Sequence, residues 1–109
     1  MKRLKRVFIC SRYSGDTEKN VLIAQRLCRW AMSSRMGYAP FAPHLIYPQF
    51  LNDDVEHERE MGIEAGKAFL QACDEVWVYE ADGISAGMEK EIAYAKSIGK
   101  PIIKVALEE

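Results

Sequence analysis

The sequence lacks long apolar runs and an excess of charge of one sign. No apolar run approaches the roughly 20 residues of a membrane-spanning helix, and the run at residues 7–10 is too short for a signal-peptide core. The formal net charge of −1 over 109 residues argues against a general nucleic-acid-binding surface. We interpret the basic cluster at residues 2–6 as a solvated end, with a nucleic-acid-binding arm as the alternative. We therefore expect neither a membrane nor a nucleic-acid partner.

Cysteine is scarce, and the usual phosphate-binding motifs are missing. Cys10, Cys28 and Cys73 are odd in number, lack Cys-x-x-Cys spacing and fall in apolar patterns, which is typical of reduced, buried thiols in a cytoplasmic protein. No Walker A motif and no Gly-x-Gly-x-x-Gly occur, so dinucleotide binding of the usual kind is not expected. His57 and Glu58 lack the second histidine of a zinc-binding His-Glu-x-x-His motif. We expect no metal and no cofactor.

Apolar runs alternate with helical periodicities along the chain. Strands are predicted at residues 6–11, 38–43, 75–79 and 101–105, and helices over residues 17–34, 53–72 and from residue 85. The first apolar run is continuous, as in a buried central parallel strand. Pro40 lacks a backbone N–H for the sheet, so the second run is predicted to be an edge strand. The pattern predicts one α/β domain over residues 1–109, with a small doubly wound, flavodoxin- or Rossmann-like parallel sheet. Its four main strands have the order 2-1-3-4, with three helices.

The predicted order leaves one helix alone on one face of the sheet. One helix cannot cover four strands, so we expect a homodimer or higher homo-oligomer, with a partner over the first helix or a sheet edge. Asp53 and Glu56 have capping-box spacing and open the second helix. The apolar stripe of that helix holds Met61, Ala65, Ala68, Phe69, Ala72 and Cys73. Gly62 and Gly66 near its centre predict close packing on the sheet, with ligand contact as the alternative.

The loops after the first and third strands meet where the strand order reverses, which is where open α/β sheets bind ligands. Both loops, residues 11–16 and 80–87, hold Ser and Gly and lead into a helix N-terminus, which favours an anion. Arg12 can add a charge-assisted contact. The organisation predicts a phosphate-sized ligand, although ordinary turns and caps have the same composition.

Other side chains fall near this predicted edge. Tyr13 and Tyr47 either stack a base or pack the loops, and His44 either donates to a ligand or caps a turn. Residues 44–52 either pack under the second helix or form a pocket wall. Glu58 falls on the apolar side of that helix, near the same edge.

One carboxylate falls inside an apolar helical stripe. Ser85 is a good N-cap for the third helix. The apolar stripe of that helix consists of Met88, Ile92, Ala95 and Ile98. Glu91 falls inside the stripe and Glu89 outside it, so Glu91 is either a surface residue bent inward or a site residue. A partly desolvated carboxylate beside a bound sugar phosphate can attack an anomeric carbon and stabilise an oxocarbenium-like transition state.

The segment around Glu91 resembles a known signature. Residues 85–95, Ser-Ala-Gly-Met-Glu-Lys-Glu-Ile-Ala-Tyr-Ala, and the later Gly-Lys-Pro at residues 99–101 are similar to that of the nucleoside 2-deoxyribosyltransferase-like superfamily. Residues 7–10 with Gly15 are similar to its first strand and loop. The superfamily includes base-exchanging transferases and deoxynucleoside 5′-monophosphate N-glycosidases. The whole chain looks more like its uncharacterised phage and bacterial members.

The resemblance implies roles by position. Glu91 becomes the nucleophile that forms a glycosyl-enzyme intermediate, and Ser85 and Gly87 match phosphate-binding positions of the monophosphate glycosidases. With the loop residues above, the expected substrate-binding set is Ser11, Arg12, Tyr13, Gly15, His44, Ser85 and Gly87. The implied function is an N-glycosidase or deoxyribosyltransferase acting on a (deoxy)nucleoside 5′-monophosphate. The alternative is a nucleotide-sensing or sequestering protein without turnover.

Two departures from the signature bear on activity. The superfamily places an Asp on the second helix about eight residues before the Asp that opens the third strand, and counting back from Asp74 gives Gly66. Glycine cannot protonate or orient a substrate, so Glu58 or a neighbouring subunit is the candidate source of a second carboxylate. The Gly two residues after the catalytic Glu is Ala93 here.

Overall fold

The sheet consists of four parallel strands in the order β2-β1-β3-β4, as predicted. The computed structural model describes residues 3–33 and 37–107. The strands are β1 (Lys5–Cys10), β2 (Tyr38–Phe41), β3 (Glu75–Tyr79) and β4 (Ile102–Val105). β1 is central, with Val7 opposite Pro40 of β2 on one side and Glu75 of β3 on the other. Residues 7–10 of β1 are buried, as a continuous apolar run predicts.

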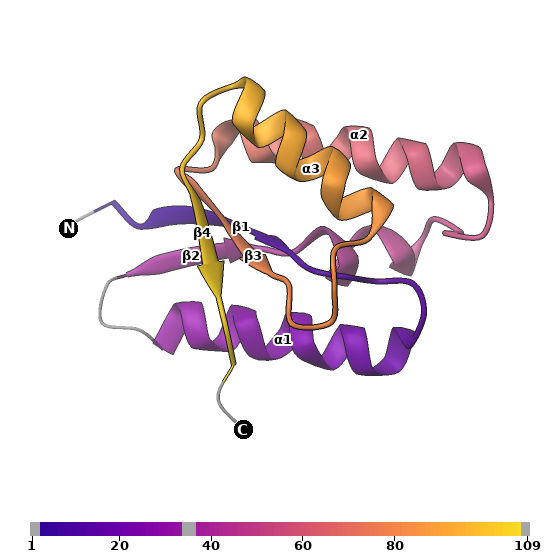
Figure 1. Ribbon diagram of the computed structural model, residues 1–109, viewed down its shortest axis with the longest axis horizontal. Helices are drawn as coiled ribbons and strands as arrows, with labels where there is room; N and C mark the ends of the chain where they lie inside the picture. The colour runs from indigo at the N-terminus through magenta and orange to yellow at the C-terminus, as the bar shows by residue number, and fades with distance from the viewer. Residues whose placement is uncertain (1–2, 34–36, 108–109) are drawn as a thin grey trace.

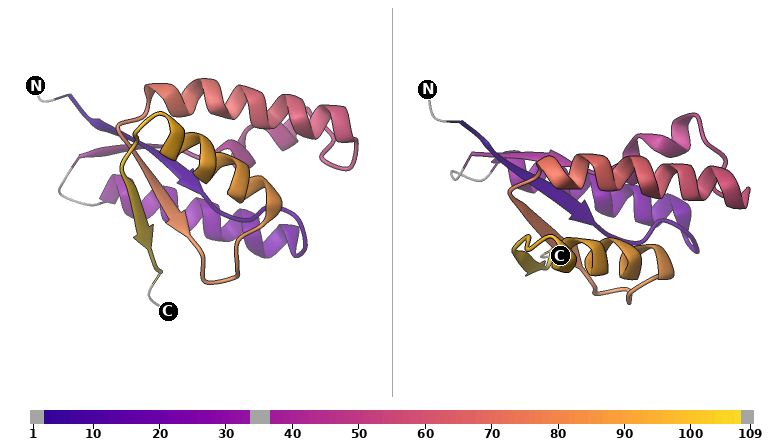
Figure 2. Two further views of the ribbon diagram at one scale, coloured as in Figure 1. Left: turned by 45° about the horizontal axis from the view of Figure 1, so that its top comes forward. Right: turned by 90° about the horizontal axis from the view of Figure 1, so that it is seen from above.

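Helices cover both faces of the sheet. The α-helices are α1 (Thr17–Ser33), α2 (Glu56–Ala72) and α3 (Ala86–Ser97), and two short 3₁₀ helices, η1 (Pro43–Leu45) and η2 (Tyr47–Gln49), connect β2 to α2. α1 lies alone on one face, and α2 and α3 lie together on the other (Figure 1 and Figure 2). No helix in the described part of the chain is long and apolar enough to cross a membrane.

A separate apolar layer lies on each face, because successive residues of a strand point to opposite sides. The layer under α1 contains Val7, Ile9, Ile23, Leu27, Ala31 and Trp77. The layer under α2 and α3 contains Phe8, Cys10, Leu70, Val76, Val78, Met88 and Ala95. Each large aliphatic or aromatic side chain fully buried in this way contributes about 1.5–3 kcal/mol. The carboxyl end of β1 is thus fixed from both faces.

α2 turns a different side to the sheet from the one that its apolar stripe predicts. Gly66 and Leu70 are its buried residues, and a Cβ atom at Gly66 would lie 3.9 Å from the Phe8 ring. Met61 and Phe69 are instead 54% and 53% exposed. The prediction of close packing at Gly66 is confirmed, but the expectation that the whole stripe faces the sheet is wrong. The helix backbone at Gly66 lies on the sheet, and the larger apolar side chains remain at the surface.

Candidate active site

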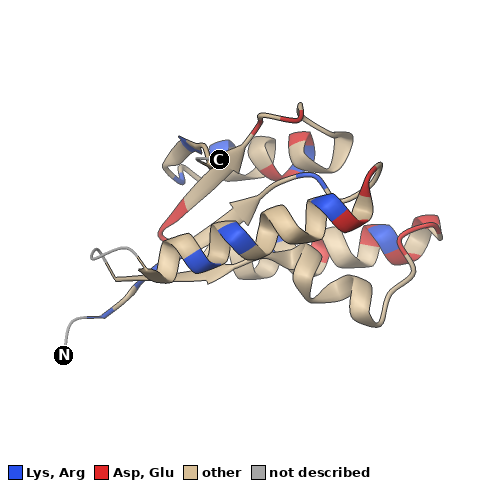
Figure 3. Cartoon of the chain, turned by 90° about the horizontal axis from the view of Figure 1, so that it is seen from below, with Lys and Arg blue, Asp and Glu red and all other residues tan. Residues whose placement is uncertain are grey.

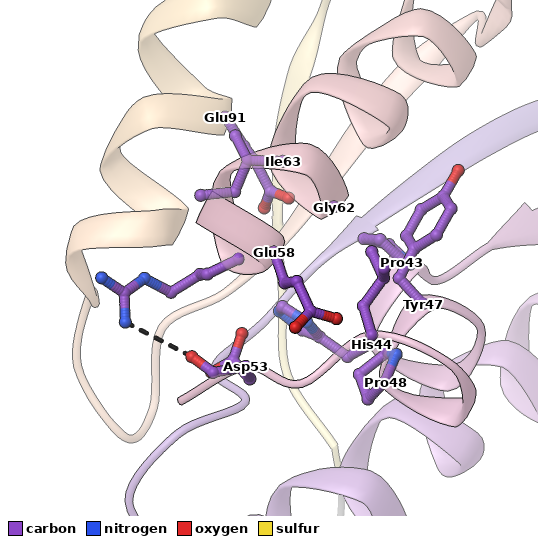
Figure 4. Close-up of a pocket in the computed structure, with 11 residues that line it drawn as sticks. Pro43, His44, Tyr47, Pro48, Asp53, Glu58, Gly62, Ile63 and Glu91 are labelled. Carbon is purple, nitrogen blue, oxygen red and sulfur yellow. Dashed lines mark hydrogen bonds between the residues drawn. The ribbon is translucent and has the colours of Figure 1, made fainter. Parts of the chain in front are cut away.

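A pocket lies at the carboxyl-terminal edge of the sheet, between the two 3₁₀ helices, the start of α2 and the second turn of α3 (Figure 4). Its cavity volume is about 40 Å³, and the wider space of about 390 Å³ includes the open solvent at its mouth. Its wall consists of Pro43, His44, Tyr47, Pro48, Leu51, Asp53, Glu58, Arg59, Gly62, Ile63 and Glu91. The segment at residues 44–52 therefore forms a pocket wall, which was one of its two predicted roles.

Glu91 is the group that α3 contributes to this wall. The Ser85 Oγ accepts a hydrogen bond from the Met88 N–H at 3.2 Å and caps the helix. This start sets the helical register, so that Glu91 is turned inward and is only 4% exposed, whereas Glu89 is exposed. Within the described residues, the Glu91 Oε1 has no hydrogen-bond partner.

Burial makes the Glu91 carboxyl group a weak acid. The pKa of Glu91 is raised from 4.5 to about 8, mainly because burial desolvates the carboxyl group, and the nearby Cys10 thiol opposes this rise in part. A carboxylate is costly inside an apolar wall because it loses its hydration. Glu91 is therefore mostly protonated at neutral pH in the free protein.

Glu58 gives the pocket a second carboxyl group. Its Oε1 accepts a hydrogen bond from the Asn52 backbone N–H at 3.1 Å. The carboxyl groups of Glu58 and Glu91 both point into the pocket, from α2 and α3 respectively (Figure 4). Glu58 therefore lies beside Glu91 at the carboxyl-terminal edge of the sheet, and its role as a second carboxylate stays a prediction.

The segment before α2 does not form the predicted capping box. α2 begins at Glu56 after Val55, and no side chain caps it. Asp53 instead lines the pocket, and its backbone carbonyl accepts a hydrogen bond from the Arg59 Nη1 at 3.3 Å. The capping-box prediction is wrong because the chain makes a further turn before the helix. Acidic residues gather at this segment (Figure 3).

His44 joins the pocket to the loop after β1. Its Nε2 lies 2.8 Å from the Ser11 carbonyl oxygen. A carbonyl can only accept, so Nε2 carries a proton and the neutral ring has an acceptor at Nδ1. Burial lowers the pKa of His44, against the opposing effects of Ser11 and Asp53. The ring also stacks on Tyr13, with centroids 5.2 Å apart, so His44 and Tyr13 pack against each other.

The loop after β1 is held by a buried amide that the sequence did not single out. Asn20 of α1 donates through Nδ2 to the carbonyls of Tyr13 and Ser14, at 3.0 and 3.1 Å. Gly15 adopts a φ of 101°, a conformation that glycine reaches without strain. Tyr13 and Gly15 line a second, open groove beside the pocket, and Asp53 belongs to both.

Arg12 connects the two loops of the switch point. Its Nη1 donates to the Asp82 backbone carbonyl at 3.3 Å, and Lys19 forms an ion pair with the Asp82 carboxylate at 3.2 Å. The two loops are thus held together, as the strand order predicts. Ser11 is 1% exposed, and its Oγ has no partner in the part of the chain that the structure describes.

The structure brings only some of the predicted site residues together. His44, Glu58 and Glu91 line the pocket, whereas Ser11, Arg12, Ser85 and Gly87 line neither the pocket nor the groove. Sequence reasoning did not select Asp53, Arg59 and Ile63 for the pocket. Asp53 was predicted to cap the second helix, Arg59 to lie in its solvated first turn, and Ile63 gave no signal beyond an ordinary helix position. Among the described residues, no group of three or more His, Cys, Asp or Glu side chains could hold a metal ion.

The fold is that of the 2-deoxyribosyltransferases. The solved structure of a 2-deoxyribosyltransferase from Bacillus psychrosaccharolyticus superposes with a TM-score of 0.66 at 16% identity, over 91% of this chain and 70% of that one. A 2-deoxyribosyltransferase from Leishmania mexicana superposes with a TM-score of 0.62 at 15% identity, over 95% of this chain and 65% of that one. No curated protein sequence matches the chain. Residues 5–105 match a family described as Domain of unknown function (DUF7768), and the chain belongs to that family.

Proposed function

We propose that this protein cleaves or transfers the N-glycosidic bond of a (deoxy)nucleoside 5′-monophosphate, with Glu91 as the nucleophile. The observation that carries the proposal is a buried carboxyl group with an unpartnered oxygen in the wall of a pocket at the carboxyl-terminal edge of the sheet. The shared fold with proteins named 2-deoxyribosyltransferases supports the class of reaction. The resemblance of the segment around Glu91 to the superfamily signature supports the choice of nucleophile.

The reaction requires the ionised form of Glu91. A carboxylate oxygen bonds to C1′ as the C1′–N bond breaks, and the electron pair leaves with the base, which takes up a proton. Water or a second base then attacks C1′ and releases Glu91, which gives hydrolysis or base transfer. With a pKa of about 8, about a tenth of Glu91 is ionised at pH 7. The rate of the chemical step is expected to rise with pH up to about 8.

The charges of the pocket support a particular placement of the substrate. Asp53 and Glu58 line it beside the mostly protonated Glu91, and Arg59 is the basic residue in the lining. A phosphate dianion would be repelled there, so the sugar and base face the mouth of the pocket. The phosphate lies toward residues 11–16 and the N-termini of α1 and α3, whose backbone N–H groups favour an anion. In this arrangement, Ser85 and Gly87 bind through the backbone, because the Ser85 hydroxyl caps α3.

A binding protein without turnover is the second candidate. Gly66 supplies no acid where the superfamily has one, and Glu91 is mostly neutral at pH 7. In the enzyme, Glu58 is the group that gives a proton to the leaving base or orients the sugar, because it is the second carboxyl group held in the pocket. The two candidates share the ligand and differ in the chemistry.

The test is release of free base from a panel of deoxy- and ribonucleoside 5′-monophosphates and nucleosides, followed by chromatography, with and without a second base. Glu91→Gln should reduce turnover at least a thousandfold and still bind the monophosphate. Glu89→Gln is the matched control, since Glu89 lies two residues away and is exposed, and it should retain activity. Inactivation by the control and not by Glu91→Gln would exclude Glu91 as nucleophile.

The same panel separates the two candidates. If no nucleotide releases base but one raises the melting temperature, the protein is a binder. If no nucleotide releases base and none raises the melting temperature, both candidates fail.

We also propose that a second copy of the chain covers the exposed apolar stripe of α2. Met61 and Phe69 are more than half exposed there, two turns apart on one side of the helix. Ala65 lies between them, so a partner can approach closely. The three cysteines are free, which supports a reducing compartment such as the cytoplasm.

A further inference from the structure

The thiol of Cys10 makes a contact that neither the fold nor the apolar pattern of β1 requires. Cys10 is the last residue of the central strand and is fully buried, and its Sγ lies 3.9 Å from the Met88 carbonyl oxygen. Met88 and Glu91 are one turn apart on the buried side of α3. The thiol therefore lies beneath the turn that carries Glu91, close enough to lower the pKa of that carboxyl group.

Cys10 is held as a neutral thiol. Burial raises the pKa of Cys10, and the neighbouring Glu91 raises it further. A neutral thiol has one proton and can donate it to only one acceptor at a time, either the Met88 carbonyl or the Glu91 carboxyl group. It is a weak donor, so it stabilises an ionised carboxylate less than a hydroxyl group in the same place would.

We infer that Cys10 is a positioning residue, whose thiol orients the Glu91 carboxyl group from the sheet side, leaves Oε1 free toward the pocket and sets the pH at which Glu91 ionises. The inference rests on the proposed function, because it concerns the nucleophile of that reaction. Oε1 lacks a partner among the described residues, so it is the oxygen available to attack a sugar. The donor strength at position 10 then determines how much of Glu91 is reactive at a given pH.

Other charged or titratable groups face the same space. His44, Asp53, Glu58 and Arg59 line the pocket together with Glu91. Their effect on Glu91 is the same in any variant at position 10, so differences between such variants report the thiol.

The experiment follows the Glu91 carboxyl carbon by NMR in the unliganded protein labelled with ¹³C-glutamate, between pH 5 and pH 10. The resonance is assigned by its loss in Glu91→Gln. Cys10→Ser puts a stronger donor in the same volume, and it should lower the midpoint by about half a pH unit. Cys10→Ala removes the donor and should raise it. Cys73→Ser is the control, since Cys73 is a buried thiol that follows α2 at the opposite end of the sheet, and it should not move the midpoint.

Glu91 midpoints that shift down in Cys10→Ser and up in Cys10→Ala support the inference. If Cys10 had a purely structural role, the direction of the shift would not follow the strength of the donor at position 10. An unchanged midpoint in Cys10→Ser overturns it, and that variant decides alone if Cys10→Ala does not fold. A shifted midpoint without base release from any nucleotide leaves the inference standing and removes the proposed function. If the protein is active, Cys10→Ser should raise kcat/KM at pH 7 about threefold, in proportion to the ionised fraction of Glu91.

Discussion

Replacing Glu91 with Gln should remove a large pH dependence from the stability of the fold. Glu91 is buried, and its pKa rises from an ordinary 4.5 to about 8 in the folded chain. Below pH 4.5 the group is protonated in both folded and unfolded chains and has no effect on their balance. As the pH rises from 4.5 to 8, the unfolded chain loses this proton first, so stability falls. Above pH 8 the cost is constant.

The size of the effect follows from the pKa difference. One unit of pKa corresponds to about 1.4 kcal/mol, so ionised Glu91 costs the folded chain about 5 kcal/mol at high pH. The corresponding cost is about 1 kcal/mol at pH 5 and about 3 kcal/mol at pH 7. A domain of this size is typically stable by about 5–15 kcal/mol, so the loss is a large part of the total. The amide of Gln keeps the volume of the side chain and carries no charge.

Urea denaturation at pH 5, 7 and 9, monitored by tryptophan fluorescence, measures the effect. The difference in unfolding free energy between Glu91→Gln and the unmodified chain should grow by about 4 kcal/mol in favour of the variant between pH 5 and pH 9. The contributions of all other titrating groups to the unfolding free energy are the same in both chains, so they cancel in this difference. Glu89→Gln, an exposed change on the same helix, should follow the unmodified chain. Parallel pH curves for Glu91→Gln and the unmodified chain would refute a buried, protonated Glu91.

Two further predictions concern the start of α3 and the surface of α2. Ser85→Ala removes the bond from the Ser85 Oγ to the Met88 N–H and should cost about 1 kcal/mol in urea denaturation; an unchanged free energy would mean that another group replaces the cap. Phe69→Glu should turn a dimer into a monomer by sedimentation equilibrium, because it places a charge in the exposed stripe. Glu64→Gln, an exposed change outside the stripe, should leave the assembly unchanged. A monomer before any substitution contradicts the proposed assembly.

The strand order and the edge of the sheet that holds the candidate pocket were predictable because they depend on strong and simple signals. The continuous run of β1 identifies a central strand, and Pro40 indicates an edge. Once the order is fixed, the topology determines which loops meet. Helical periodicity also places Glu91 inward, since the Ser85 cap leaves little freedom in the register of a short helix.

The packing face of α2 and the details of the loops were not predictable from the same signals. Periodicity identifies the apolar side of a helix, but it does not show that Gly66, and not Phe69, meets the sheet. Close approach at a glycine depends on the opposing side chain, which here is Phe8. Asn20 gives no signal either, because its role depends on two carbonyl groups that only the folded loop presents.

The glycine line of α2 bears on the missing carboxylate. Glu58, Gly62 and Gly66 are spaced four residues apart, so they follow one side of the helix. Gly66 packs over Phe8 and is not part of the pocket wall, whereas Glu58 and Gly62 are. A Cβ atom at Gly62 would lie 3.6 Å from the Leu51 side chain, which is an ordinary contact distance. In the proposed reaction, the second carboxyl group therefore belongs to the first turn of α2, two turns before the position that the superfamily signature implies.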